Sequence, residues 1–203
     1  WKGVLWKDGQ PTYFTEEVGT EVTGLYVKEG KYIIEGNMTA DSGDIVTCIW
    51  TEEGVQVISE GMALCQGTGL AVAGSDIYVA GNAYDMDYGT YEEIYRSPVW
   101  KNGTELYTLT DGTNDAWARS VCVADGTVYV AGYEQQPDGV VAKLWENGTL
   151  KYTLGNGGGN SYAYAVAAAR GSVYTAGSEE DGGALTAKVW KDGTELYAYS
   201  VSP

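Results

Sequence analysis

Residues 119–154 read RSVCVADGTVYVAGYEQQPDGVVAKLWENGTLKYTL, and this stretch decides the fold. Short runs rich in Val, Tyr, Leu and Trp alternate with glycine-bearing turns, which is typical of β-strands and not of helices. Asp125-Gly126 and Asn147-Gly148 indicate tight hairpins, because Asn, Asp and Gly tolerate the positive φ that primed turns require. The stretch therefore predicts four antiparallel strands, at Arg119–Val123, Val128–Tyr133, Val140–Trp145 and Leu150–Leu154.

The same pattern recurs along the whole chain. A Trp followed by a turn occurs at Trp6, Trp50, Trp100, Trp145 and Trp190, with spacings of 44, 50, 45 and 45 residues. A Tyr-containing strand that closes on glycine ends at Gly36, Gly81, Gly132 and Gly177, with spacings of 45, 51 and 45. Two markers with one period of about 45 residues predict an all-β chain built from the four-stranded antiparallel blades of a β-propeller. We expect the periodic tryptophans to be packing residues.

One domain is expected over residues 1–203, with a two-stranded partial blade at 1–20 and four blades at about 21–60, 61–110, 111–155 and 156–203. Eighteen strands make four and a half blades. Three arrangements accommodate them: a fragment of a larger propeller, a five-bladed ring with one degenerate blade, or pairing with another chain. An open repeat end exposes apolar surface and unpaired backbone groups. We therefore expect a truncated form to self-associate through the partial blade.

Charge and composition narrow the functional classes. The 203 residues carry 28 acidic and 12 basic side chains, a net charge of −16, which would repel nucleic acid and anionic membranes. The chain has no His, which removes His-based triads, His metal ligands and the usual proton carrier near neutral pH. No cofactor is expected. No membrane insertion is expected either, since no run of about 18 apolar residues is present. Cys48 and Cys122 lie in apolar runs and are interpreted as small buried hydrophobic residues.

The order of features, an apolar strand, a turn, a Tyr-containing strand ending in Gly and a strand ending in Trp, resembles kelch-type propeller blades. Kelch blades usually carry a paired glycine after the second strand, whereas the glycines here stand alone. Trp100-Lys-Asn-Gly-Thr together with Val128-Tyr-Val-Ala-Gly-Tyr-Glu134 is most similar to an extracytoplasmic repeat family of gut Bacteroidetes, largely of unassigned function. That resemblance covers nearly the whole chain and implies an exported bacterial protein, secreted, periplasmic or at the cell surface. It brings no known active site with it.

Positions that differ between units are the candidates for ligand contact. Two repeat positions at the start of each unit's first strand differ in this way. One is occupied by Trp117, Tyr162, Gln66 and Glu21, and the other by Arg119, Tyr164, Thr68 and Thr23. A kelch-like strand order places these residues on one face with the loops between second and third strands, one of which begins at Tyr84. Aromatic rings stack on sugars while polar groups bind hydroxyls, which suggests a glycan ligand. The candidate ligand-binding residues are Trp117, Arg119, Tyr162, Tyr164, Gln66 and Tyr84; alternatively, the rings only pack against neighbouring blades.

The acidic residues offer two further hypotheses. Asp85 and Asp87 resemble the opening of a calcium-binding loop, but Arg96 stands where the bidentate Glu belongs, so a solvated acidic face is the preferred interpretation over a Ca²⁺ site. Glu35 is the carboxylate candidate for catalysis, because it sits in an apolar run that would raise its pKa, at a position where the other units have Ala. It is equally compatible with a strand residue facing solvent.

These observations favour a non-catalytic binding or interaction module over an enzyme. Glycan binding on the face around the propeller axis is the first hypothesis. A glycoside hydrolase that works with two carboxylates is one alternative, and a structural repeat that binds a protein partner is the other.

Overall fold

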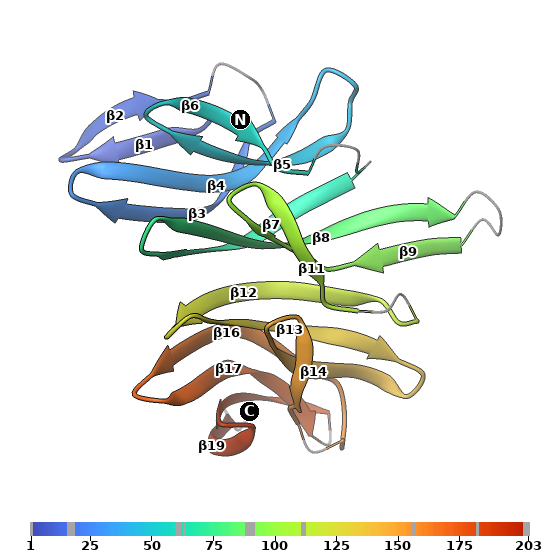
Figure 1. The fold of residues 1–203 in the computed structure, drawn as a ribbon. Helices are drawn as coiled ribbons and strands as arrows, with labels where there is room; N and C mark the ends of the chain where they lie inside the picture. Colours follow the sequence, from blue (N-terminus) through green and yellow to red (C-terminus); the bar gives the residue numbers. More distant parts are fainter. Residues whose placement is uncertain are drawn as a thin grey trace.

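The computed structural model describes residues 2–15, 19–59, 62, 64–87, 92–110, 113–155, 157–181 and 183–200. These residues form nineteen strands and no helix, so the prediction of an all-β chain is confirmed. The chain starts with an isolated two-stranded sheet, which we call the N-terminal hairpin, and continues with four antiparallel units (Figure 1). No sheet among the described residues closes on itself into a ring or barrel.

The strand bounds follow the predicted repeat. The N-terminal hairpin has β1 (Val4–Lys7) and β2 (Gln10–Tyr13). Unit 1 has β3 (Glu21–Lys28), β4 (Lys31–Thr39), β5 (Ile45–Thr51) and β6 (Gly54–Val57). Unit 2 has β7 (Leu64–Ala73), β8 (Asp76–Asp87), β9 (Glu92–Arg96), β10 (Pro98–Lys101) and β11 (Thr104–Thr108). Unit 3 has β12 (Ala116–Ala124), β13 (Thr127–Gln136), β14 (Gly139–Glu146) and β15 (Thr149–Thr153), and unit 4 has β16 (Ser161–Ala169), β17 (Ser172–Asp181), β18 (Ala184–Lys191) and β19 (Thr194–Ser200).

Unit 2 departs from four strands because its third strand is split. The long strand β8 pairs with β10 near its start and with β9 near its end, and Ser97 separates β9 from β10. This extended hairpin accounts for the longer spacing of 50 residues between Trp50 and Trp100. It carries two of the rings described below.

The units stack in chain order. Strand β3 contacts β7, β7 contacts β12, and β12 contacts β16, so the first strands of successive units lie side by side. In Figure 1 the N-terminal hairpin lies at one end of this stack and β19 at the other. A parallel bridge between Ile45 and Leu64 also joins units 1 and 2 into one hydrogen-bonded sheet.

The Asn-Gly and Asp-Gly turns adopt the hairpin conformation predicted for them and also hydrogen-bond to a neighbouring strand. Asn102, Asn147 and Asp192 all have positive φ, as tight primed hairpins require. Each also accepts a hydrogen bond on its side-chain oxygen from a backbone N–H of the same unit's second strand, at 2.8, 3.0 and 2.9 Å respectively. For Asp192 this backbone N–H is the main cause that holds the carboxyl pKa below its usual value. The turns therefore tie the outer hairpin to the inner strands.

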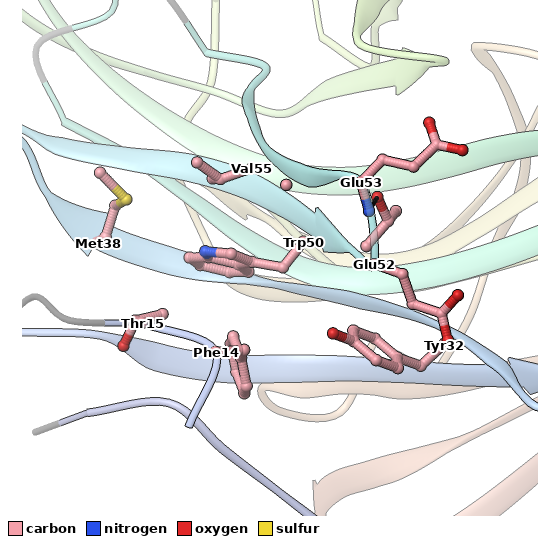
Figure 2. A pocket seen from close by; sticks show the side chains of 10 residues that line it. Phe14, Thr15, Tyr32, Met38, Trp50, Glu52, Glu53 and Val55 are labelled. Atoms are coloured by element: carbon pink, nitrogen blue, oxygen red, sulfur yellow. Dashed lines mark hydrogen bonds between the residues drawn. The ribbon is translucent and has the colours of Figure 1, made fainter. Parts of the chain in front are cut away.

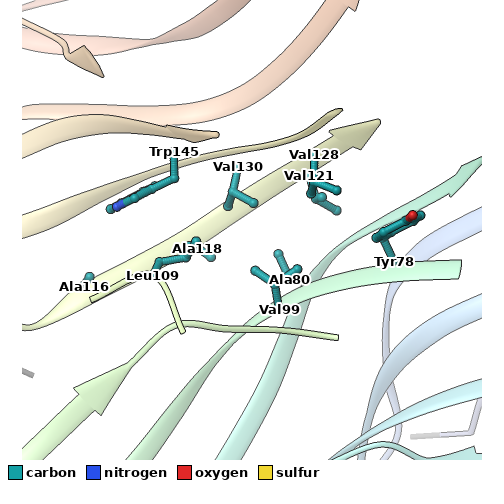
Figure 3. Close-up of a cluster of buried hydrophobic side chains, with 10 residues drawn as sticks. All are labelled: Tyr78, Ala80, Val99, Leu109, Ala116, Ala118, Val121, Val128, Val130 and Trp145. Carbon is teal, nitrogen blue, oxygen red and sulfur yellow. The ribbon is translucent and has the colours of Figure 1, made fainter. Parts of the chain in front are cut away.

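The hydrophobic core lies between successive units. Figure 3 shows one of its clusters, in which Val99 and Leu109 of unit 2 face Val121, Val130 and Trp145 of unit 3. Two further clusters occupy the equivalent places at the neighbouring interfaces, and a fourth lies between the N-terminal hairpin and unit 1. Each unit therefore buries both of its faces only when a unit stands on either side.

The periodic tryptophans follow this rule with one exception. Trp50, Trp100, Trp145 and Trp190 are each 4% exposed or less, which confirms their predicted packing role. The same prediction for Trp6 is wrong, because its side chain is 66% exposed. The reason is its place on the outward face of the N-terminal hairpin, at the end of the stack.

The prediction that Cys48 is buried is confirmed, whereas Cys122, predicted to be buried as well, is only half-buried. Cys48 and Cys65 are buried and Cys122 is half-buried, and no disulfide joins any of the three, all of which lie in the described part of the chain. Burial raises the pKa of the Cys65 and Cys122 thiols to about 11. A thiol with such a pKa is a poor nucleophile near neutral pH.

Candidate functional site

Six aromatic rings form a continuous row across units 2, 3 and 4. Neighbouring ring centroids are 5.2, 5.7, 5.4, 5.1 and 6.1 Å apart, and the last two rings are nearly parallel, with an interplanar angle of 4°. We call this row the aromatic ridge; in order it comprises Tyr84, Tyr95, Trp117, Tyr133, Tyr162 and Tyr164. Four of the six candidate ligand-binding residues are members.

Strand register explains why these rings lie in one row. Tyr84 of β8 stands opposite Tyr95 of β9, and Trp117 of β12 stands opposite Tyr133 of β13. Residues directly opposite in an antiparallel pair point to the same face of the sheet and contact each other. Because units 2 and 3 stack through β8, β9 and β12, the two pairs meet where Tyr95 contacts Trp117.

A β-bulge recurs at the same place in all four units. The first strand of each unit shifts register by one residue, and the extra residues are Thr23, Thr68, Arg119 and Tyr164. These are the residues that the sequence placed at one repeat position. A bulge redirects a side chain and often lies next to a functional site. Here it turns Arg119 and Tyr164 toward the ridge, where Arg119 contacts Tyr133 and Tyr164 contacts Tyr162.

The single glycine of each repeat makes room for this bulge. Gly36, Gly81, Gly132 and Gly177 each stand opposite the residue just before the bulge. A Cβ atom on any of them would overlap a backbone carbonyl of the facing strand; for Gly132 this is the carbonyl of Trp117. The repeat glycine and the displayed ring are therefore two parts of one local structure.

A pocket of about 590 Å³ lies beside the ridge between units 2 and 3. Its walls include Gln66, Tyr84, Trp117 and Arg119, so the structure brings together four of the six candidate ligand-binding residues. Tyr162 and Tyr164 extend the ridge beyond the pocket. None of the described residues that line the pocket is Asp or Glu; the others are Ile45, Leu64, Thr68, Asn82, Ala83 and Tyr95.

The polar groups at the pocket divide into structural and exposed ones. Thr68 and Asn82 hold unit 3: the Thr68 hydroxyl donates to the Ala118 carbonyl at 2.9 Å, and the Asn82 side-chain oxygen accepts the Ala118 N–H at 2.8 Å. Gln66 is exposed. Arg119 is also exposed; it lies 5.2 Å from the centre of the Tyr133 ring and donates a hydrogen bond to the Tyr133 hydroxyl. Gln66 and Arg119 are therefore exposed side chains at the pocket that carry hydrogen-bond donors.

At the far end of the ridge, Tyr162 stays protonated. Burial raises the pKa of its hydroxyl, and the negative charge of Glu180 raises it further. Glu180 in turn accepts a hydrogen bond from the Asn160 side chain at 3.0 Å. The Tyr162 hydroxyl is therefore a neutral donor and acceptor at any physiological pH.

Glu35 is not among the residues that line the pocket. Its side chain is 0% exposed, and the Thr23 hydroxyl donates to Oε2 at 2.6 Å. Burial raises the pKa of this carboxyl to about 7; the Thr23 hydrogen bond opposes the increase and the charge of Glu21 adds to it. A Cβ atom on Gly67 of unit 2 would overlap Glu35 Oε1, so this side chain fills the space between units 1 and 2. Glu35 is therefore a buried carboxyl at the interface of units 1 and 2, and the alternative that it is a strand residue facing solvent is wrong.

The possible calcium site falls largely outside what the structure describes. The backbone of Asp85 and Asp87 belongs to β8, but their side chains are among those outside the described residues. Within the described residues no group of three or more acidic, Cys or His side chains is arranged to hold a metal ion.

A second hollow, which the sequence did not indicate, lies between the N-terminal hairpin and unit 1. Figure 2 shows its lining, in which the Phe14 ring meets the Trp50 ring edge-on at 5.6 Å and Glu52 and Glu53 stand at the rim. Its volume is about 380 Å³. A feature of the sequence that could have drawn attention to it is the turn after Trp50, where Glu52-Glu53-Gly54 replaces the Asn-Gly or Asp-Gly of the other repeats.

No protein-family model matches the chain, and neither does any curated protein. Across the described residues, no helix has both the length and the apolar character needed to cross a membrane. The site must therefore be interpreted from its own geometry.

Proposed function

We propose that this chain is a non-catalytic carbohydrate-binding module whose binding surface is the aromatic ridge with its adjoining pocket. The observation that carries the proposal is the row of six rings in contact, which crosses units 2, 3 and 4. A row of rings offers several stacking surfaces for successive sugar residues, and the pocket offers donors to their hydroxyls. A linear oligosaccharide fits this surface better than a compact ligand.

The charge distribution favours a neutral glycan. The net charge of −16 repels uronic or sulfated sugars at a distance, and Arg119 is the only basic side chain among the residues that line the pocket as described. Binding is favoured over hydrolysis because none of the described lining residues is a carboxylate and the Glu35 carboxyl is fully buried.

The proposal includes a propeller architecture and an extracytoplasmic location. Four stacked antiparallel units with first strands side by side support the propeller interpretation. The location rests on the resemblance of the Trp100 and Val128 motifs to exported repeats. In a kelch-like arrangement the ridge lies on the face around the axis.

Tryptophan fluorescence tests the proposal directly, because Trp117 is the ridge's only tryptophan. We expect emission to change during titration with one of a panel of neutral gluco-, xylo-, manno- and chito-oligosaccharides. Trp117→Ala should weaken binding at least about tenfold, since large aromatic anchors dominate such interfaces. Tyr13→Ala is the matched control: Tyr13 is an exposed aromatic residue on the N-terminal hairpin, away from the ridge.

Two results would refute carbohydrate binding at this surface. One is the absence of any fluorescence or calorimetric response across the panel at millimolar sugar. The other is binding that Trp117→Ala leaves unchanged while circular dichroism shows the variant to be folded.

A further inference from the structure

One contact is repeated at every junction between successive units. The residue that follows the outer strand of one unit packs with the periodic tryptophan of the next, within a shared buried cluster or, at the first junction, ring against ring. The four pairs are Phe14 with Trp50, Ile58 with Trp100, Leu109 with Trp145 and Leu154 with Trp190.

Backbone pairing shows that these residues are structurally equivalent. The N–H groups of Phe14, Ile58, Leu109 and Leu154 each donate to the carbonyl three residues before the tryptophan of their own unit, namely Gly3, Thr47, Ser97 and Ala142. In unit 4 the corresponding pair is Tyr199 opposite Ala187. Tyr199 is therefore the residue that would contact the tryptophan of a following unit.

A second contact accompanies the first at the junctions of units 1 and 2, 2 and 3, and 3 and 4. Gln56, Tyr107 and Tyr152 cover the turn glycines Gly103, Gly148 and Gly193 of the following unit, closely enough that a Cβ atom there would overlap each side chain. The side chain at this position in unit 4 is Tyr197. Together the two contacts form a two-point interface: an apolar residue on a tryptophan, and a planar side chain on a glycine turn.

Both halves of this interface are uncovered at the ends of the stack. Tyr197 and Tyr199 on unit 4 are 68% and 70% exposed. On the N-terminal hairpin Trp6 is 66% exposed, and a Cβ atom on Gly9 would have no heavy atom within 4 Å. Figure 1 shows the N-terminal hairpin and β19 at opposite ends of the stack, so the patches that they carry do not meet within one chain.

We propose that Tyr197 and Tyr199 of one chain dock on Gly9 and Trp6 of a second copy. Tyr199 takes the place of Leu154 against a tryptophan, and Tyr197 takes the place of Tyr152 over a glycine turn. The proposed interface would repeat the contacts that join successive units within the chain. Since the two patches differ, the contact is head-to-tail, and repetition gives chains of copies or a closed ring.

A second copy is the occupant because this chain carries both complementary patches. Trp6-Lys-Asp-Gly9 repeats Trp190-Lys-Asp-Gly193, the motif that Leu154 and Tyr152 contact, residue for residue. An unrelated partner would have to present the same tryptophan and glycine turn by coincidence. The proposal does not depend on carbohydrate binding, since the ridge shares no residue with either patch.

Light scattering on the 203-residue chain and two variants tests the proposal. We expect the mass to rise above 21.7 kDa with concentration. Trp6→Ser and Tyr199→Ser should each weaken association about tenfold or more. An equimolar mixture of the two variants should form a species of twice the chain mass, because each variant retains the patch that the other has lost. An isologous interface would give no such recovery.

Leu196→Ser is the matched control. Leu196 lies on the same strand as Tyr197 and Tyr199 and is 43% exposed, but Leu106 at the equivalent place inside the stack is also 43% exposed. Its exposure therefore does not result from a missing neighbour, and the variant should associate like the original chain. A monomer at every concentration would overturn the proposal, as would association that Trp6→Ser and Tyr199→Ser leave unchanged, or a mixture that stays monomeric.

Discussion

Replacing Glu35 by Gln should stabilise the protein at neutral and alkaline pH. Glu35 stands where units 2, 3 and 4 have Ala80, Ala131 and Ala176, so no other unit buries a carboxyl here. Its side chain is fully buried against Gly67, and desolvation raises its pKa from 4.5 to about 7. Burial therefore makes the ionised form unfavourable in the folded state.

The magnitude follows from the linkage between protonation and folding. Below pH 4.5 the carboxyl is protonated in both the folded and the unfolded chain and contributes no pH dependence. Between 4.5 and about 7 the unfolded chain releases the proton while the folded chain retains it, so the free energy of unfolding falls as pH rises. At about 1.4 kcal/mol per pH unit, Glu35 should cost about 3 kcal/mol above pH 7.

Urea unfolding from pH 4.5 to 8.5, on the original chain and on Glu35→Gln, measures this cost. Gln retains the acceptor for the Thr23 hydroxyl, and any penalty from its buried amide is the same at every pH. The diagnostic quantity is therefore the difference in unfolding free energy between the two proteins, which should grow by about 3 kcal/mol in favour of Gln as pH rises. Subtracting the two curves cancels the titration of the other 27 acidic residues, since the chain has 28 in all.

A difference that stays constant over this range would refute the reasoning. It would mean that Glu35 ionises in the folded protein as easily as in the unfolded chain, and hence that water reaches its carboxyl between units 1 and 2.

Two other substitutions test neighbouring parts of the structure. Glu179→Gln should have the opposite effect, a loss of about 3 kcal/mol in the free energy of unfolding. The reason is that Glu179 is buried in an ion pair with Lys188 at 2.6 Å. A neutral or stabilising result in urea unfolding at pH 7 would contradict this prediction. Gly132→Ala should lower the free energy of unfolding by about 1–3 kcal/mol, because its Cβ atom would overlap the Trp117 carbonyl. The variant should also bind sugar more weakly, since Trp117 has to move. Calorimetry and fluorescence titration check the two effects, and unchanged binding would show that the bulge does not position the binding surface.

The regular part of the fold follows from the sequence because its causes are local. Asn102-Gly103 and Asn147-Gly148 specify their hairpins through positive φ, and the spacing of the tryptophans specifies how many strands separate them. Trp6 was misassigned because burial is not a local property. The same Trp-turn motif is buried or exposed according to whether a unit stands in front of it.

Only part of the candidate site could be predicted from the sequence. Gln66, Trp117 and Arg119 were found because they differ at positions where other features repeat, and they line one pocket. Tyr95 and Tyr133 were missed. Tyr95 lies in the few extra residues that lengthen the second repeat, which was a signal in the sequence. Tyr133 faces Trp117 only because the bulge at Arg119 shifts the register by one residue, and the predicted hairpin contained no bulge.

The bulge explains how one repeat combines a constant framework with a variable surface. Gly132 and its equivalents must remain glycine because a carbonyl occupies the place of the missing Cβ atom, and Trp145 must remain large because the preceding unit packs against it. The residue two positions before the bulge has its backbone committed, since its carbonyl faces the glycine. Its side chain is not held by that contact, and in units 3 and 4 it is a ring of the ridge, Trp117 or Tyr162. The side chain at this position therefore differs between units without disturbing the stack; the four residues are Glu21, Gln66, Trp117 and Tyr162. Under the proposed function, ligand preference could change at this position without a change of fold.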